Sequence, residues 1–259
     1  MTFPRLQLFE FEDQTWFPAI VRDLATDYLA FMQTTFGLDR PIVPILAEAL
    51  RKTGHRRILD LCSGGGGPTQ KIQKALSAAG LNPRIILTDR FPNLRALERI
   101  AQTPPGKISF IGRPVDARAV PDQLRGFRTI FNSFHHFCEA DAREILRNAV
   151  AATQPIAVFE YPERAALIVF LTFILTPFVV ALATPFIRPF RWSRLVLTYL
   201  LPLIPLTCWW DGVVSHLRAY NVGELRDLTK DLPAYSWQAG AIALPRSPGH
   251  LTYLIGYPR

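Results

Sequence analysis

Short apolar runs alternate with amphipathic stretches over much of the chain. The amphipathic stretches at 68–79, 93–101 and 140–152 have the apolar spacing of helices. Continuous apolar strands between helices are typical of a parallel sheet that is covered on both faces. We therefore predict an α/β fold with a doubly wound, mostly parallel sheet. Its strands are expected in the apolar runs at 57–61, 84–88, 107–111, 127–131 and 155–159.

The segments on either side of this pattern predict further elements. Apolar residues at helical spacing predict helices at 15–36, before Gly37, and at 42–52, before Gly54. Near the end of the chain, Asn221 and Glu224 have the spacing of a capping box, which predicts a helix to about residue 230. Two final strands are expected at 236–243 and 251–257, joined by the turn-rich stretch 245–249.

An uncharged insertion interrupts the α/β pattern. Residues 165–187 carry no charge, and as a helix they would be about 35 Å long, enough to cross a hydrocarbon core of about 30 Å. A basic and aromatic link at 188–194 leads to a second uncharged run at 195–210. Three interpretations stay open: a membrane-embedded hairpin, a monotopic cap in one leaflet, or a buried lid or dimer interface of a soluble enzyme. The size of the apolar run favours membrane association.

These boundaries divide the chain into four parts. Residues 1–54 form N-terminal helices, which we expect to cover an acceptor site. The α/β core spans 55–160, the apolar insertion spans 161–220, and residues 221–259 complete the core.

Composition narrows the class of protein. Of 259 residues, 49% are apolar and only 19% are charged, against about 25% in an average soluble domain. This excludes a disordered chain and a collagen-like repeat. The net charge is +8, but the basic residues are scattered except for Arg188, Arg191 and Arg194. That cluster suggests anionic lipid headgroups rather than nucleic acid.

The cysteine spacing indicates whether disulfides or metal sites are expected, and the N-terminus indicates where in the cell the protein is expected. The three cysteines are far apart and form no CxxC pair, so we expect neither a disulfide framework nor a metal site. The N-terminus lacks the pattern of a secretory signal. We expect the protein on the cytoplasmic side of a membrane, associated through residues 165–210.

A glycine-rich turn after the first predicted strand carries the clearest chemistry. Asp60 ends that strand and Gly64–Gly67 follow, so the backbone can approach a ligand closely. Asp89, at the end of the next strand, is placed to bind both hydroxyls of a ribose. The glycines do not complete a G-x-G-x-x-G pattern, and Asp60 would repel a diphosphate, so NAD is disfavoured. An acidic residue here suits a cofactor with a free amino group.

These residues resemble the first motif of the class I S-adenosylmethionine-dependent methyltransferases. Residues 59–66 (LDLCSGGG) are similar to an acidic residue followed by G-x-G-x-G, with Cys62 in place of the first glycine. The resemblance continues at Asp89, at residues 115–117 (VDA) and at residues 131–136 (FNSFHH), and it spans about 40–160 and the last 40 residues.

The resemblance implies S-adenosyl-L-methionine as cofactor and assigns roles to single residues. Asp60 and the backbone of Gly64, Gly65 and Gly66 would hold the methionine part, with Cys62 shaping the turn. Asp89 would bind the ribose hydroxyls, and Asp116 would meet the adenine amino group. Asn132, after the fourth strand, is expected to bind the cofactor as well.

Two polar groups are candidates for the acceptor side. His135 or His136 would act as a general base if the acceptor must lose a proton, although either could equally cap a helix or pack on the cofactor. Asp211, Ser215 and Arg218 share one helical face, which is either a substrate-facing patch or an ion-paired lock between insertion and core.

The sequence therefore predicts a methyltransferase that acts on a small hydrophobic or lipid-like acceptor at a membrane, with no nucleic-acid partner. One alternative is a nicotinamide-dependent oxidoreductase on the same fold. The other is a non-catalytic, membrane-associated protein that binds the cofactor.

Overall fold

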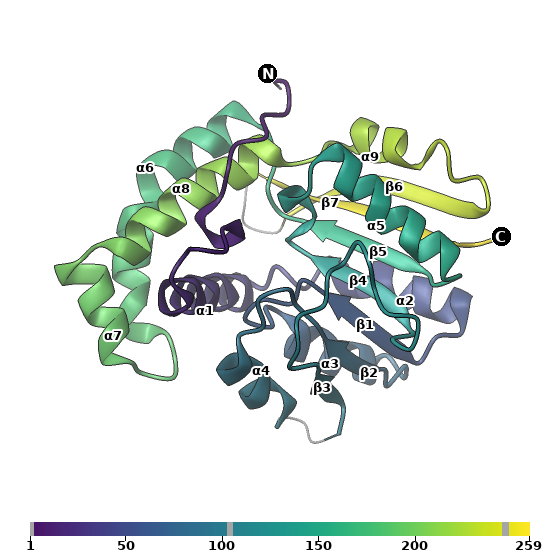
Figure 1. Ribbon diagram of the computed structural model, residues 1–259, viewed down its shortest axis with the longest axis horizontal. Helices are drawn as coiled ribbons and strands as arrows, with labels where there is room; N and C mark the ends of the chain where they lie inside the picture. Colours follow the sequence, from purple (N-terminus) through teal and green to yellow (C-terminus); the bar gives the residue numbers. More distant parts are fainter. Residues whose placement is uncertain (1–2, 103–105, 245–248) are drawn as a thin grey trace.

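A single mixed sheet forms the centre of the protein (Figure 1). The computed structural model describes residues 3–102, 106–244 and 249–259. In the part of the chain described, seven strands lie in the order β3-β2-β1-β4-β5-β7-β6. The prediction of a doubly wound, mostly parallel sheet is confirmed. Residues 245–248 of the predicted turn at 245–249 lie outside the described residues. The strands are β1 (Arg57–Leu61), β2 (Arg84–Leu87), β3 (Ile108–Phe110), β4 (Phe127–Phe131), β5 (Ile156–Glu160), β6 (Tyr235–Ala243) and β7 (His250–Pro258).

The strand directions place every loop after β1, β2, β4 and β5 at one edge of the sheet. Strands β1 to β5 are parallel, with Asp60 beside Leu87 on one side and beside Thr129 on the other. Only β7 runs the other way, antiparallel to β5 and to β6. Because the carboxyl ends of parallel strands meet at one edge, the polar residues that follow them come together.

Helices cover both faces of the sheet, which explains the continuously apolar strands. Ile58 packs into one core cluster with α2 and α3, whereas its neighbour Leu59 packs into another with α5 and α9. The predicted capping box at Asn221 and Glu224 begins α9. The helices of this part are α1 (Ala19–Phe36), α2 (Ile42–Thr53), α3 (Thr69–Ala78), α4 (Leu94–Ala101), α5 (Glu139–Ala151) and α9 (Val222–Thr229), with 3-10 turns at Phe11–Asp13 and Phe134–His136.

The apolar insertion folds into an arm beside the sheet, built from α6 (Ala166–Ala183), α7 (Trp192–Leu195) and α8 (Leu203–Arg218). A 3-10 turn, Thr184–Phe186, extends α6, and a π-helical turn, Val196–Leu200, follows α7. Helices α6 and α8 pack closely, since a Cβ on Gly212 would lie 3.4 Å from Thr172. The arm rests on α1 through a separate core cluster that includes Leu24, Val180 and Ile204.

The two uncharged runs adopt different structures in the arm. Ala166–Phe186 is long and apolar enough to cross a membrane, and only 11% of its most apolar window is buried. The second run is not one helix, because the chain bends by 75° between Trp192–Leu200 and Leu203–Arg218. Pro202 lies at this bend, where it has no backbone N–H to continue the helix. Helix α8 then continues past Trp210 to Arg218.

Candidate active site

The turn after β1 has the backbone geometry of a ligand-binding loop. Cys62, Gly64 and Gly66 all have positive φ, of 58°, 51° and 82°. A side chain on Gly66 would overlap α4, because a Cβ there would lie 2.0 Å from Cδ1 of Ile100. Glycine at 66 is therefore required by conformation and by contact, whereas Cys62 adopts a conformation that L-residues rarely take.

Asp60 lies beneath this turn and organises it. Its Oδ1 accepts a hydrogen bond from Thr129 Oγ1 at 2.6 Å, and its Oδ2 accepts one from Ser63 Oγ at 2.7 Å. The side chain is nearly fully buried. Burial raises the pKa of Asp60 to about 7, although both hydroxyl bonds oppose the shift.

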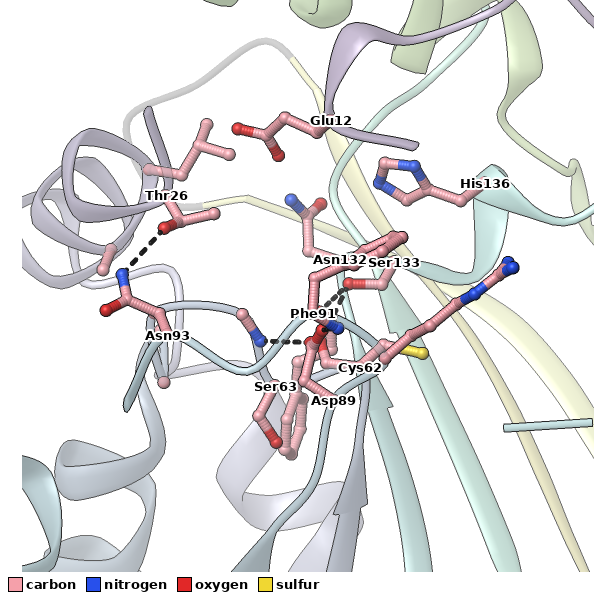
Figure 2. A pocket seen from close by; sticks show the side chains of 18 of the residues that line it. Glu12, Thr26, Cys62, Ser63, Asp89, Phe91, Asn93, Asn132, Ser133 and His136 are labelled. Atoms are coloured by element: carbon pink, nitrogen blue, oxygen red, sulfur yellow. Dashed lines mark hydrogen bonds between the residues drawn. The ribbon is translucent and has the colours of Figure 1, made fainter. Parts of the chain in front are cut away.

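Asp89 holds the turn from the second strand. Its Oδ2 accepts the amide of Gly64 at 2.7 Å, and its Oδ1 accepts the amide of Phe91 at 2.6 Å. Burial raises the pKa of Asp89, against the effect of these two amide bonds. The two predicted carboxylates, from adjacent strands, thus line one space. Figure 2 shows Asp89 among the residues that line it.

That space is an open cavity of about 310 Å³ above the glycine turn. The turn and the ends of β1, β2 and β4 form its floor, and α1 contributes Thr26, Leu29 and Gln33 to its wall. Figure 2 shows Glu12 and His136 on the opposite side from the turn. The cavity is concave, mixed in polarity and at the carboxyl edge of the sheet, where such folds bind ligands.

The two histidines follow β4 and have different surroundings. His135 is buried, and its Nδ1 lies 2.5 Å from Oε2 of Glu160. His136 is partly exposed, and its Nδ1 lies 2.8 Å from Asp13 Oδ1 and 3.2 Å from Glu10 Oε2. Burial favours the neutral ring, but these carboxylates outweigh it and raise the pKa of His136 to about 10. His136 is therefore protonated at neutral pH and donates a hydrogen bond in this arrangement.

A second cavity of about 210 Å³ meets the first at His136. Its wall combines α1, the loop after β5 and helix α8 of the arm. Apolar groups such as Met32, Leu38 and Cys208 line it beside polar ones. The residues common to both cavities are Glu12, Leu29, Gln33, Asn132 and His136.

The N-terminal segment supplies acidic residues that the sequence did not single out. Glu12 lines both cavities, and the amides of Phe11 and Glu12 donate to the Asp211 carboxylate at 2.8 and 3.1 Å. Burial and the nearby Asp211 raise the pKa of Glu12 well above its usual value. Single carboxylates in an irregular segment form no recognisable spacing, so only the fold brings them to the site.

The polar face of α8 acts mainly as a lock. Arg218 donates to Asp13 Oδ2 at 2.8 Å and to the carbonyl oxygen of His135 at 3.1 Å. Ser215 donates to Glu10 Oε1 at 3.3 Å. These contacts support the interpretation that Asp211, Ser215 and Arg218 fix the insertion to the core, although Asp211 and Ser215 also line the second cavity.

Comparison with known proteins identifies the fold. No family model matches the chain, and no curated protein matches it. Many solved structures do match. The methyltransferase domain of bacterial CtHen1-CN is 14% identical with a TM-score of 0.50, and the match covers 86% of this chain and 100% of that one. A Nostoc punctiforme protein described as an O-methyltransferase is 14% identical with a TM-score of 0.51. The chain has the class I methyltransferase fold.

The lengths of these proteins differ from that of the chain. The match to the Nostoc protein covers 90% of this chain but 59% of that one. The chain likewise spans 56% of an O-methyltransferase family protein from Burkholderia thailandensis, at a TM-score of 0.45.

Within this class I methyltransferase fold, the predicted site residues gather with one exception. Asp116 does not line either cavity described here, and it pairs with Arg118 at 2.7 Å. Arg118 and its second partner Asp141 line the first cavity instead. His135 lines only the second cavity. The predicted residues on the first cavity are Asp60, Cys62, Gly64, Gly65, Gly66, Asp89, Asn132 and His136.

Proposed function

We propose that the protein is an S-adenosyl-L-methionine-dependent methyltransferase whose cofactor binds in the 310 Å³ cavity. The observation that carries this proposal is the pair of carboxylates, Asp60 and Asp89, that flank a glycine turn open to that cavity. A turn without side chains admits a ligand against the backbone, and the carboxylates suit an amino group and ribose hydroxyls. The fold supports the same cofactor.

The residues present fit that cofactor. Asp60 and the turn at Gly64–Gly66 would hold the methionine part, and Asp89 would bind the ribose hydroxyls in place of the Gly64 amide. Asn132, between the two cavities, would contact the reacting end. The adenine contact predicted for Asp116 gains no support from its position, and Arg118 lines the cavity in its place.

We propose the second cavity as the acceptor site. When bound, the cofactor supplies an electrophilic methyl group, and methyl transfer is an in-line displacement that depends on alignment of donor and acceptor. Helix α1 and the N-terminal segment line both cavities, and α8 lines the second. Glu12 and His136 are the ionisable side chains shared by the two cavities. Because His136 is protonated, it would orient an acceptor by donating a hydrogen bond. A role as general base requires the loss of that proton.

Calorimetry with S-adenosylhomocysteine and with NADH tests the cofactor assignment. Only the first should bind, and Asp89→Ala should weaken its binding by at least about tenfold, the equivalent of one lost charge-assisted contact. Asp122→Ala, an exposed carboxylate away from the cavities, is the control. Binding of NADH in preference would refute the proposal. Labelled methyl donor supplied with a membrane extract would then identify the acceptor by the mass of its product.

We further propose that the acceptor is small and hydrophobic or lipid-like, and that the arm associates with a membrane. Apolar side chains line the acceptor cavity, and α8 forms both its wall and part of the arm. Most of the exposed large apolar side chains of the described residues belong to the arm. Leu182, Trp192 and Leu200 are each more than 70% exposed, at 73%, 74% and 76%. Such a surface is unfavourable in water and favourable in the interfacial layer of a bilayer.

The basic link contributes less to this surface than its sequence suggests. The expectation that Arg188, Arg191 and Arg194 together meet lipid headgroups is wrong for Arg194, which is buried and donates to Asp27 at 2.7 Å. Arg191 also lies 3.5 Å from Asp27. Arg188 alone of the three is exposed. Membrane binding should therefore depend on apolar insertion more than on anionic lipid.

Flotation with neutral phosphatidylcholine vesicles tests the association. The full chain should float with the vesicles at both low and high salt. The double substitution Leu182→Asp and Leu200→Asp should abolish flotation, since a charge inserted into lipid costs several kcal/mol. Leu94→Asp, an exposed leucine on α4, is the matched control. Equal flotation of both variants would refute the role of the arm.

A further inference from the structure

Three metal-ligating side chains converge at the second cavity. Glu10, His135 and His136 each present one ligand atom, and these atoms all lie within 4.8 Å of one another. His136 Nδ1 is 3.2 Å from Glu10 Oε2, and His135 Nε2 is 4.0 Å from Glu10 Oε1. Ligand atoms about 2.1 Å from a tetrahedral ion lie roughly 3.4 Å apart. The cluster thus has nearly the dimensions of a coordination shell.

A second layer of contacts orients one of these ligands. Glu160 accepts the amides of Phe134 and His135 at 2.7 and 3.3 Å, which fixes its carboxylate. Its Oε2 lies 2.5 Å from Nδ1 of His135. An ionised carboxylate only accepts hydrogen bonds, so Nδ1 carries a ring proton. Nε2 is then the nitrogen available to a metal ion, and it lies 4.0 Å from Oε1 of Glu10. A carboxylate behind a histidine is the usual support of a metal-binding imidazole.

Further charges surround the cluster. Asp13 adds a carboxylate 2.8 Å from His136 Nδ1. Arg218 lies 2.8 Å from Asp13 and 3.4 Å from Glu10, and it also donates to the backbone carbonyl groups of both histidines. The surplus of carboxylates favours a cation among them. The competing explanation is that the His136 proton and Arg218 already balance these acids as a buried ionic network.

We propose that Glu10, His135 and His136 bind a divalent transition-metal ion of the zinc class, with Asp13 as a further oxygen donor. The ion would take the place of the His136 proton, so the hydrogen bond that His136 donates belongs to the metal-free protein. Ions of the zinc class bind a donor set of two imidazoles and a carboxylate, whereas Mg²⁺ and Ca²⁺ prefer oxygen ligands alone. All three side chains line the second cavity, so a remaining coordination position would be open to a ligand there. The proposal rests on these side chains alone and stands whether or not the protein transfers methyl groups.

Titration of the chelator-stripped full chain with Co²⁺ tests the site, because Co²⁺ reports its coordination in the visible spectrum. One Co²⁺ should bind per chain and be displaced by Zn²⁺. Glu10→Gln and His136→Gln should each abolish binding at micromolar Co²⁺. Glu160→Gln should weaken it about 10–100-fold, as expected for a positioning residue behind a ligand. His55→Gln, a histidine outside both cavities, is the control and should bind as the unaltered chain does.

Each result decides the proposal. Circular dichroism and thermal melting of every variant establish that it is folded. Should Glu10→Gln fail to fold, His136→Gln and the stoichiometry of the unaltered chain still give the answer. Failure of the unaltered chain to bind one Co²⁺, or equal binding by His136→Gln, would overturn the site and leave the ionic network. Calorimetry with S-adenosylhomocysteine on the same stripped protein reports separately on the proposed cofactor cavity.

Discussion

The α/β core and the arm are built from similar apolar residues but use them in opposite ways. In the core, helices cover both faces of the sheet, and Leu59 and Leu146 are fully buried. In the arm, α6 and α8 pack on each other and on α1, and many of the large apolar side chains of the arm are exposed to solvent. An apolar run of the same composition thus encodes either a core or an exposed surface, depending on whether another element covers it.

The joint between the two regions should be the most sensitive to substitution. Asp27 on α1 lies within 2.7 Å of Arg194, 3.5 Å of Arg191 and 3.3 Å of Arg99. Asp27→Asn leaves the buried Arg194 without its counter-charge, so the free energy of unfolding should fall by about 3–5 kcal/mol in urea titration.

Asp227→Asn is the control for that change. Asp227 pairs with Lys230 on the surface, so this substitution should alter stability by less than about 0.5 kcal/mol. If Asp27→Asn costs less than about 1 kcal/mol, the apolar contacts alone hold the arm to the core.

A pair of leucines tests the contrast directly. Leu146→Ala creates a cavity in the core and should lower the free energy of unfolding by about 2–5 kcal/mol. Leu200→Ala, on the exposed tip of the arm, should change it by less than about 0.5 kcal/mol in water. In vesicle flotation the larger effect should come from the other variant: Leu200→Ala should bind vesicles more weakly than the unaltered chain, and Leu146→Ala should bind them equally well. A large loss of stability in water from Leu200→Ala would mean that the arm buries this side chain in solution.

Proton binding by Asp60 should appear in the pH dependence of core stability. Its pKa is raised to about 7, against 3.8 in the unfolded chain, so the folded state binds an extra proton between these values. The free energy of unfolding should therefore fall as the pH rises from 4 to 7. Asp60→Asn should remove this contribution and gain up to about 4 kcal/mol over the unaltered chain above pH 7. The exposed Asp231→Asn should leave the slope unchanged.

A comparison of two glycines distinguishes the cost of a steric clash from the cost of an unfavourable backbone conformation. Gly66 and Gly80 have φ values of 82° and 80°, but only Gly66 has a neighbour that a Cβ would meet, Ile100 at 2.0 Å. Gly80→Ala should cost about 1 kcal/mol for its conformation. Gly66→Ala should cost about 1–3 kcal/mol more and weaken S-adenosylhomocysteine binding. Equal decreases in the melting temperatures of the two variants would show that α4 shifts to accommodate the added methyl group.

The fold followed closely from local patterns. β1 and β4 have the predicted bounds, and Asn221 begins α9 through the predicted capping box. These features depend on periodicity and on side chains within three or four residues, which a sequence displays directly. The glycine turn with Asp60 and Asp89 could be predicted in the same way, because Asp60 lies near the end of β1 and Asp89 follows β2 by two residues.

The rest of the site depends on contacts between distant residues. Glu10 and Asp13 reach His136 across more than 120 residues, and Asp27 pairs with Arg194 across 167. Nothing in the local sequence distinguishes these carboxylates from solvated ones. Asp116 is an example of a local pattern that misleads. It follows the third strand, as the expected motif requires, but its carboxylate accepts a hydrogen bond from Arg118, two residues later.

Helix α1 belongs to both regions at once. Leu24 and Tyr28 face the arm, whereas Thr26, Leu29 and Gln33 line the cavities one turn away. Because one helix contacts both the arm and the cavities, a displacement of the arm against α1 would reach the wall of the ligand chamber. If the arm binds a membrane as proposed, we expect the lipid surface to influence ligand binding through this shared helix.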